Sequence, residues 1–267
     1  MVGFDTRNVA RIHGSSVSRD EDLVASEEAL TISLYDHQNG FHNIGVTMRT
    51  GGDDRNLVLG FLYSEGIIES IDHVIEIESD QDSVTVRLGS NSSFDPNVHC
   101  RPSTVTSSCG ICGRSTIDDS LHMHAPDLDE EFRISINIVA LCLDSMISKQ
   151  KLFEKTGGSH ACATFDANGV MHRVFEDIGR HNAMDKLVGS YVSDSMVPTR
   201  GLATFVSGRA SFELVQKSIR AGFPIMVSIG APTTLAVDLA NEYGMSLICF
   251  AKKDSVSIFS GLRRVID

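Results

Sequence analysis

The strongest constraint on the fold is an alternation of strand and helix patterns in the second half of the chain. Short apolar segments typical of strands alternate with segments whose apolar residues recur at helical spacing: "LATFVSG", "SFELVQKSIRAG", "PIMVSIG", "PTTLAVDLANEYG" and "SLICFAK". The connections between them are short, so consecutive strands are expected to run parallel with helices covering the sheet. The pattern predicts an α/β domain with a mixed, partly parallel sheet.

Four further segments extend this domain toward the N-terminus. "SINIVALCLDSMISKQKLF" has helical spacing and ends at "TGG", while "HNAMDKLVGSYVS" predicts a second helix. Between them, "ACATFD" and "GVMHRVFE" flank an Asn-Gly pair, which is the commonest signal of a β-hairpin. We assign residues 129–267 to a C-terminal α/β domain.

Residues 1–128 are predicted to form a strand-rich N-terminal domain. Its strand candidates are "ALTISLY", "FHNIGVTMRT", "VIEIES" and "SVTVRLG", and "DDRNLVLGFLYSEGII" predicts one helix. Residues 89–108 are rich in Ser, Asn and Pro and predict a long loop. The overall class is therefore α/β, or α+β when both parts are taken together.

Charge and hydropathy exclude several kinds of partner. The chain has 23 Lys and Arg residues and 35 Asp and Glu residues, which gives a formal net charge of −12. Non-specific electrostatic binding to nucleic acid or to an anionic membrane is therefore not expected. A local basic pocket remains compatible with that balance. No apolar stretch approaches the ~20 residues that cross a bilayer, and the N-terminus lacks a secretory pattern, which predicts a cytoplasmic protein.

The stretch "TSSCGICGRST" places Cys109 and Cys112 at the end of the predicted loop. Two of three interpretations treat the pair as a redox dithiol or as part of a zinc site. Thioredoxin-like dithiols lie between a strand and a helix, whereas a long loop precedes this pair. A structural zinc site needs four ligands, and the nearby candidates fit no common zinc-finger spacing and lack the zinc deaminase signature: His99, Cys100, His122 and His124.

The third interpretation is a thiol that accepts and passes on sulfur. Such a thiol must be an accessible thiolate that approaches two partners. Gly110 and Gly113 permit close approach, successive backbone N–H groups can stabilise a thiolate, and Arg114 adds positive charge. The chemistry favours this interpretation, although the residues alone leave all three open.

Four turns in the second half share a second pattern, with glycines or a helix start beside a strand: "KTGGSH", "FEDIGRHNAMDK", "VSGRASFE" and "SIGAPTTLA". In open α/β sheets such turns lie at the carboxyl ends of strands, where ligands bind. Helix N-termini and arginine side chains both suit phosphate. The candidate binding residues are Gly157, Gly158, His160, Asp177, Arg180, His181, Asn182, Ser207, Gly208, Arg209, Ala231, Pro232 and Thr233.

Each of these turns also has a purely structural interpretation. Gly-Ser turns, and a proline such as Pro232 at a helix start, commonly mark the boundaries of helices and strands in proteins. Asp177 and Arg180 would form a plain ion pair, His181 would cap its helix, and His160 would be a satisfied buried histidine. Neither a dinucleotide-binding GxGxxG nor a P-loop sequence is present.

Taken together, "SSCGICG", "TGGSH", "EDIGRHNAMDK", "SGRASFE" and "GAPTTLAVDLANEYG" resemble the FdhD family of formate dehydrogenase accessory sulfurtransferases, over roughly residues 28–260. The resemblance implies a cytoplasmic, often dimeric protein. It would take sulfur from a cysteine desulfurase and deliver it to the molybdenum bis(molybdopterin guanine dinucleotide) cofactor of formate dehydrogenase. That cofactor would be a bound substrate, with no permanently bound metal. Cys109 would carry the persulfide and Cys112 would be its companion.

The family's cofactor-contacting stretch corresponds here to "CFAKKDSVS", which adds six candidates: Phe250, Ala251, Lys252, Lys253, Asp254 and Ser255. Lys252 stands where the family usually has Arg, Ser257 where it has Asn, and Gly230 where Ser often precedes "APT". Lysine meets a phosphate as a point charge and lacks the planar fork of arginine.

Three further expectations complete the sequence interpretation. One alternative function is a non-catalytic cofactor chaperone with a redox or zinc-binding CxxC. A deaminase-like nucleotide enzyme would match the expected deaminase-like layering but lacks its HxE signature. Residues 100–115 are expected to be mobile, because sulfur must pass between two large partners.

Overall fold

A computed structural model describes residues 3–38, 40–99 and 125–267. Cys109 and Cys112 of the CxxC motif lie outside these residues. The expectation that residues 100–115 are mobile also concerns residues outside the described ranges.

The C-terminal part is built on one mixed, partly parallel sheet, as predicted, and this sheet has six strands. Its strands are β8 (His160–Phe165), β9 (Met171–Asp177), β10 (Ala203–Val206), β11 (Ile225–Ser228), β12 (Ser246–Lys252) and β13 (Ser255–Ser260). They lie in the order β13-β12-β11-β10-β8-β9. β10, β11 and β12 are parallel, whereas β8 is antiparallel to both β9 and β10. The edge strand β13 was not predicted.

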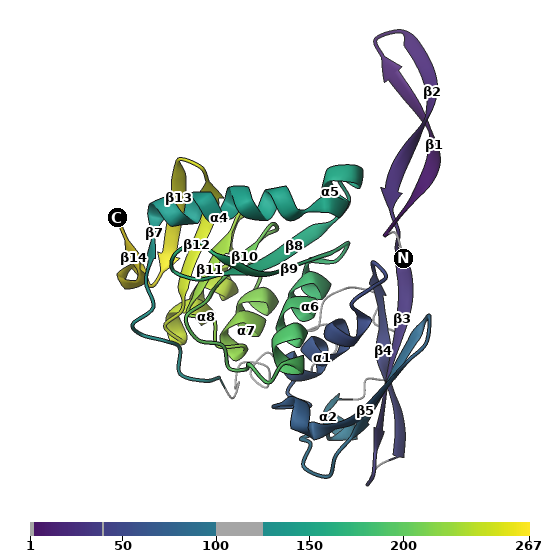
Figure 1. The fold of residues 1–267 in the computed structure, drawn as a ribbon, viewed down its shortest axis with the longest axis vertical. Coiled ribbons are helices and arrows are strands. Elements are labelled where there is room, and N and C mark those ends of the chain that lie inside the picture. The colour runs from purple at the N-terminus through teal and green to yellow at the C-terminus, as the bar shows by residue number, and fades with distance from the viewer. Residues whose placement is uncertain (1–2, 39, 100–124) are drawn as a thin grey trace.

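Helices cover both faces of this sheet (Figure 1). They are α4 (Ile136–Lys149) and α5 (Lys151–Thr156) on one side, and α6 (Arg180–Ser193), α7 (Phe212–Arg220) and α8 (Thr234–Glu242) on the other. Alternate side chains of each strand divide between two apolar clusters: Ile225 and Val227 pack in the α4 cluster, and Met226 in the opposite one. The single helix expected through Phe153 breaks at Gln150, whose ψ of 72° is outside the helical range.

The N-terminal part contains a four-stranded sheet and one long helix. The strands are β3 (Glu28–Asp36), β4 (Gly40–Arg49), β5 (Val74–Ser79) and β6 (Ser83–Leu88), in the order β4-β3-β6-β5. The helices are α1 (Asp54–Ser64), the 3-10 turn η1 (Ile71–His73) and α2 (Pro96–His99). The four predicted strands are confirmed, and they pair antiparallel as β3 with β4 and β5 with β6. The predicted loop 89–108 is corrected, because it holds the short helix α2.

The two parts share one apolar core, because α1 lies directly against α6. A Cβ on Gly60 would lie 1.9 Å from the carbonyl oxygen of Asp185, and one on Gly189 would lie 1.8 Å from that of Asn56. Only glycine permits this separation of the two helices. Buried residues from before and after the predicted boundary near residue 128 therefore belong to one cluster. As a result α6 is buried from His181 to Val192.

Residues 4–25 form a hairpin that projects from the body (Figure 1). Its strands, β1 (Phe4–His13) and β2 (Ser16–Ala25), pair with each other and with no other strand that the structure describes, and we call the hairpin the arm. The sequence did not predict it. A short parallel pair, β7 (Ile134–Ser135) and β14 (Val265–Ile266), and the turn η2 (Leu262–Arg264) complete the fold. Within the described ranges, no helix has the length and apolar character needed to span a membrane.

Candidate functional site

The predicted binding turns meet at one edge of the six-stranded sheet. β9 is antiparallel to β8, and β8 is antiparallel to β10, so β9 runs in the same direction as β10, β11 and β12. These four strands therefore end at the same edge, where β8 begins at His160. We call this region the carboxyl edge. It brings together turns that are up to 90 residues apart in the sequence, from residue 160 to residue 250.

Backbone hydrogen bonds join the turns that follow β10, β11 and β12. Gly230 N donates to Gly208 O at 3.1 Å, and Ala210 N donates to Ala231 O at 3.0 Å. Phe250 N donates to Gly230 O at 3.1 Å. The stretches 207–210, 228–233 and 250 are consequently neighbours, as the sequence analysis expected of their strand ends.

Small residues at this edge allow the turns to approach closely. A Cβ on Gly208 would lie 3.4 Å from His160 Nδ1 and 3.6 Å from Arg180 Cδ. A Cβ on Gly230 would lie 2.8 Å from Gly208 O, closer than real Cβ atoms come to backbone. Gly230, which stands where the family often has serine, is therefore the residue that fits this arrangement.

The carboxyl edge gathers positive charge in a chain that is acidic overall. Arg209, Lys252 and Lys253 are exposed there, and Arg180 has a buried Nε with no hydrogen-bond partner among the described residues. Burial, with the nearby charges of Arg180 and His181, lowers the pKa of His160 below its usual range. These groups favour an anion with several oxygens, such as a diphosphate.

Asp177 holds the turn between β9 and α6. Its carboxylate pairs with Lys186 Nζ at 2.8 Å, accepts from Gly179 N at 2.9 Å, and accepts from Thr50 N at 3.2 Å. The suggested ion pair with Arg180 is therefore wrong: the partner is Lys186. Both side chains are at least 98% buried, so the pair positions the turn and presents no carboxylate to a ligand.

Asn182 ties the same turn to the N-terminal part. Its side-chain amide donates to Met48 O at 2.7 Å and to Asp177 Oδ1 at 3.1 Å, while Thr47 Oγ1 approaches its oxygen at 3.3 Å. The amide is therefore occupied within the chain. Like Asp177, Asn182 supports the carboxyl edge instead of facing a ligand.

His181 links α6 to α7. Its Nε2 lies 2.8 Å from Glu213 Oε2 and 3.3 Å from Ser211 Oγ, in a setting where both ionisable side chains are less than a tenth exposed. It therefore pairs with α7, which corrects the expectation that it caps its own helix. Its Nδ1 is buried and has no partner among the described residues.

Two helices, α6 and α8, have their N-termini at the carboxyl edge, and they differ in whether a side chain caps the first N–H groups. No side chain caps α6 at Gly179, so the first N–H groups of this helix remain available to an anion. In contrast, Thr233 Oγ1 accepts from Ala236 N and caps α8, which begins at Thr234. Pro232 therefore lies before the helix and not in its first turn, and the Thr233 hydroxyl is already engaged.

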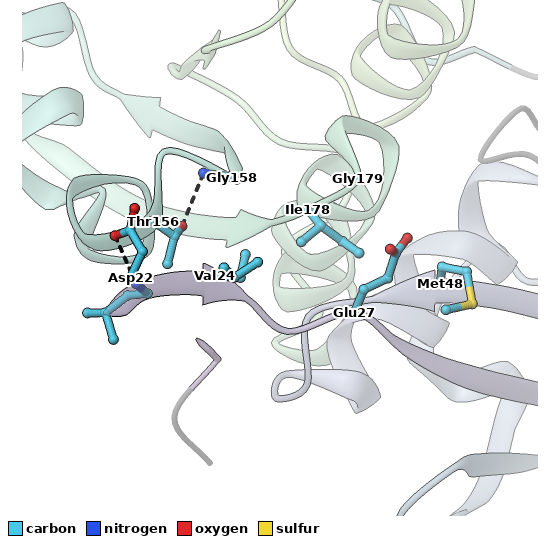
Figure 2. Close-up of a pocket in the computed structure, with 10 residues that line it drawn as sticks. Asp22, Val24, Glu27, Met48, Thr156, Gly158, Ile178 and Gly179 are labelled. Atoms are coloured by element: carbon cyan, nitrogen blue, oxygen red, sulfur yellow. Dashed lines mark hydrogen bonds between the residues drawn. The ribbon is translucent and has the colours of Figure 1, made fainter. Parts of the chain in front are cut away.

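A cavity of about 470 Å³ lies beside the carboxyl edge, between the base of the arm and the body (Figure 2). Val24, Thr156 and Gly158 line one side of it, and Glu27, Ile178 and Met48 line the other. Gly158 and Gly179 thus connect this cavity to the predicted binding turns. Gly157, the neighbouring candidate, is exposed and ends α5 with a φ of 63°.

The remaining candidates lie at the end of β12. Ala251 is buried, whereas Asp254 and Ser255 are exposed at the turn into β13. Phe250 is 44% exposed and has a φ of 51°, a conformation that is rare for an aromatic residue. Ser207 lies at the end of β10, where its hydroxyl accepts from Ala161 N at 2.9 Å.

The described cysteines are poor nucleophiles. Cys142, Cys162 and Cys249 are free thiols in the core. Burial raises the pKa of Cys142 and of Cys249 to about 12, and it raises the pKa of Cys162 as well. At neutral pH these three thiols are therefore not expected to act as nucleophiles. The described residues contain no cluster of three or more metal-binding side chains, and the zinc alternative for the CxxC stays open because that motif lies outside them.

Sequence reasoning missed the groups that support the site. Lys186 forms a buried ion pair with Asp177, and the Glu213 carboxylate lies against His181. Thr50 Oγ1 accepts a hydrogen bond from Ile178 N at 3.2 Å. A signal was present for Lys186, since a lysine within a helix that is otherwise suited to burial requires a partner. No sequence signal pointed to Thr50, which lies in the other half of the chain.

Comparisons with known proteins agree with this architecture. The sequence model described as the FdhD/NarQ family matches residues 25–266. Similar curated proteins are the "Sulfur carrier protein FdhD" of Thermoplasma acidophilum, 40% identical over 98% of this chain and 93% of its own length, and that of Sulfurisphaera tokodaii, 39% identical over 97% of each. A crystal structure of a putative formate dehydrogenase accessory protein from Desulfotalea psychrophila superposes with a TM-score of 0.81 at 21% identity, covering 99% of this chain and 100% of that one. The chain therefore belongs to the FdhD/NarQ family.

Proposed function

We propose that this protein carries sulfur, as a persulfide on Cys109, from a cysteine desulfurase to the molybdenum bis(molybdopterin guanine dinucleotide) cofactor of a formate dehydrogenase. Relatives about 40% identical over nearly the whole chain bear the name sulfur carrier protein. The observation that supports the proposal is the convergence of four turns on a basic carboxyl edge, because positive charge and exposed backbone N–H groups suit the phosphates of a nucleotide.

The carboxyl edge binds the guanine nucleotide and diphosphate portions in this proposal. Arg180 and Arg209 direct guanidinium donors at phosphate oxygens, and Lys252 adds a point charge. The uncapped N–H groups at the start of α6 contribute further donors. Phe250, exposed on a backbone that deviates from strand geometry, offers a ring on which a purine stacks.

Sulfur moves in two thiol exchange steps. The Cys109 thiolate attacks the terminal sulfur of the desulfurase persulfide, so the sulfur–sulfur bond of the donor breaks and the desulfurase cysteine leaves as a thiolate. Cys112 thiolate then attacks the Cys109 sulfur. The terminal sulfur leaves at the sulfide level toward the molybdenum of the bound substrate, and a Cys109–Cys112 disulfide remains. A thiol reductant restores the pair.

The proposed partners are a cysteine desulfurase, a formate dehydrogenase and a second copy of the chain, and the proposed location is the cytoplasm. Buried Cys142, Cys162 and Cys249 do not compete for sulfur, because burial holds their pKa values high. This leaves the CxxC pair as the acceptor in the proposal.

Nucleotide binding tests the role of the carboxyl edge. Titration calorimetry with guanosine diphosphate is expected to show binding by the intact protein, weakened about tenfold in Arg209→Met, which removes one charge-assisted contact. Arg200→Met is the matched control, because Arg200 is also exposed but precedes β10 at the opposite edge. Absence of binding, or equal losses in both variants, would contradict the assignment.

The chaperone alternative makes a different prediction for the CxxC. Elemental analysis of freshly purified protein would then find stoichiometric zinc that disappears in Cys112→Ser. A metal-free protein that accepts sulfur on Cys109 supports the carrier.

A further inference from the structure

The arm has no apolar core of its own. None of its residues belongs to either buried cluster, and its strands pair with no other described strand. An isolated two-stranded ribbon is at best marginally stable in water. Its tip nevertheless exposes Ile12 by 71% and Val17 by 65%. A surface of this kind is stabilised when another molecule covers it.

The two faces of the arm differ in how their charges are satisfied. On one face, Arg11 pairs with Asp22 at 2.7 Å and Arg7 pairs with Asp5 at 3.3 Å. On the opposite face, which we call face A, neither Arg19 nor Glu21 forms an ion pair with any described residue. Face A therefore offers one free charge of each sign at the middle of the ribbon.

Face A is complementary to itself under a two-fold rotation. Beyond the basal pair of Phe4 with Ala25, the register places four successive pairs on it, from base to tip: Thr6 with Leu23, Asn8 with Glu21, Ala10 with Arg19, and Ile12 with Val17. A two-fold axis between the second and third pairs sets Arg19 of each copy opposite Glu21 of the other. The same rotation sets the apolar tip of each copy against Leu23 of the other. Isologous contacts of this kind are typical of homodimers.

The cavity at the base of the arm fits this arrangement. In an antiparallel pair, the tip of one arm reaches the base of the other, where Leu23 and Ala25 lie on face A and line the cavity of about 470 Å³. The opposite wall includes Met48 and Ile178, so apolar groups are available to an incoming isoleucine or valine. Through Gly158 and Gly179 this cavity adjoins the carboxyl edge.

We propose that two copies of this chain pair their arms antiparallel through face A, so that Ile12 and Val17 of each copy enter the cavity at the base of the other's arm. The pairing joins the second copy to the wall of the candidate site. It rests on the proposed function only for the expectation of a homodimer, to which it assigns a surface. The matched family region begins at residue 25, so all of the arm except its last residue precedes that region.

Light scattering after size exclusion tests the pairing in the full-length protein. The intact chain is expected to be a dimer at micromolar concentration, and a chain lacking residues 4–25 is expected to be a folded monomer, since the clusters contain no arm residue. Arg19→Glu, and separately Glu21→Arg, places like charges opposite each other twice per dimer. Each is expected to raise the dimer dissociation constant about tenfold or more.

A charge exchange makes the test specific. Arg19→Glu mixed with Glu21→Arg restores two opposite-charge contacts, so the mixture is expected to form heterodimers as tight as the original. Arg7→Glu makes the same charge change on the other face and is the matched control, expected to change the dissociation constant less than about twofold. An intact monomer, a dimer that persists without the arm, or equal effects of Arg7→Glu and Arg19→Glu would overturn the pairing.

Sulfur transfer and dimerisation are measured by separate experiments on the same variant. Persulfide loading of Cys109 in the Arg19→Glu variant reports on the proposed function, whereas its dissociation constant reports on the arm. An arm needed for desulfurase binding in a monomeric chain would also overturn the inference, since its partner would then be a different protein.

Discussion

Replacing Lys186 with methionine should strongly destabilise the protein, because it leaves the buried carboxylate of Asp177 without its positively charged partner. Lys186 Nζ lies 2.8 Å from Asp177 Oδ2, and the side chains are 2% and 0% exposed. Removing one partner of such a pair costs about 3–5 kcal/mol, and solvent screening does not reduce the cost at this burial. For a chain of this size, about 2–4 °C of melting temperature is lost per kcal/mol, which predicts a decrease of roughly 6–20 °C.

Thermal unfolding followed by circular dichroism measures this decrease, since the chain has no tryptophan. Lys149→Met is the matched control: Lys149 is exposed at the end of α4, and its loss should change stability by less than about 0.5 kcal/mol. The double variant Asp177→Asn with Lys186→Met removes both charges and keeps an acceptor for Gly179 N. It should recover about 2 kcal/mol relative to Lys186→Met alone. A melting temperature for Lys186→Met within about 3 °C of the original would refute the reasoning.

Four shorter predictions follow from other contacts. Gly60→Ala and Gly189→Ala each force a Cβ against the backbone of the facing helix and should cost at least about 3 kcal/mol, seen as a lower melting temperature; unchanged melting would mean that α1 and α6 are not in backbone contact. Gly230→Ser pushes the turn after β11 away from Gly208 and should weaken guanosine diphosphate binding by about tenfold in calorimetry, whereas equal or tighter binding would contradict it. Because burial raises their pKa values, Cys142, Cys162 and Cys249 should resist iodoacetamide at neutral pH in the folded protein and react after unfolding, as peptide mass spectrometry would report. Burial and the charges of Arg180 and His181 lower the pKa of His160 in the folded protein. The unfolded chain therefore binds more protons below about pH 6.5, so the free energy of unfolding falls on acidification. His160→Gln should reduce the difference between the urea midpoints at about pH 7.5 and about pH 5.5, and an unchanged difference would count against this reasoning.

The C-terminal sheet was predictable because local signals agree with its final structure. Asn168 and Gly169 form the turn between β8 and β9, where Gly169 takes a φ of 79° that few other residues adopt. Short connections then fix the parallel order of β10, β11 and β12. From strand direction alone, the turns after these strands had to meet at one edge, which is how the sequence located most of the candidate site.

The arm was not predictable because its strands lack the usual alternation. Charged residues occur on both of its faces, as in Arg7 opposite Asp22 and Ala10 opposite Arg19. A strand normally reveals itself by one apolar face that a core covers. If a second copy supplies the cover, the information lies in the dimer and is absent from the local pattern.

The supporting contacts of the site were hidden for a different reason. Lys186, Asp177 and Thr50 come together across 136 residues of sequence, because Lys186 Nζ also donates to Thr50 O at 2.9 Å. Such pairings depend on how α6 is enclosed between the sheet and α1. Sequence spacing within one element carries no trace of them, so the contacts by which Asp177 and Asn182 hold the turn were not predicted.

The most direct measurement of the central claim is persulfide formation on Cys109. The intact protein would be incubated with a cysteine desulfurase and cysteine, alkylated without reductant, and analysed by peptide mass spectrometry. The account predicts one added sulfur on the peptide that carries Cys109, no transferable sulfur in Cys109→Ala, and sulfur retained on Cys109 when Cys112→Ser blocks its release. An intact protein that acquires no sulfur, or a Cys109→Ala protein that acquires as much, would contradict the account.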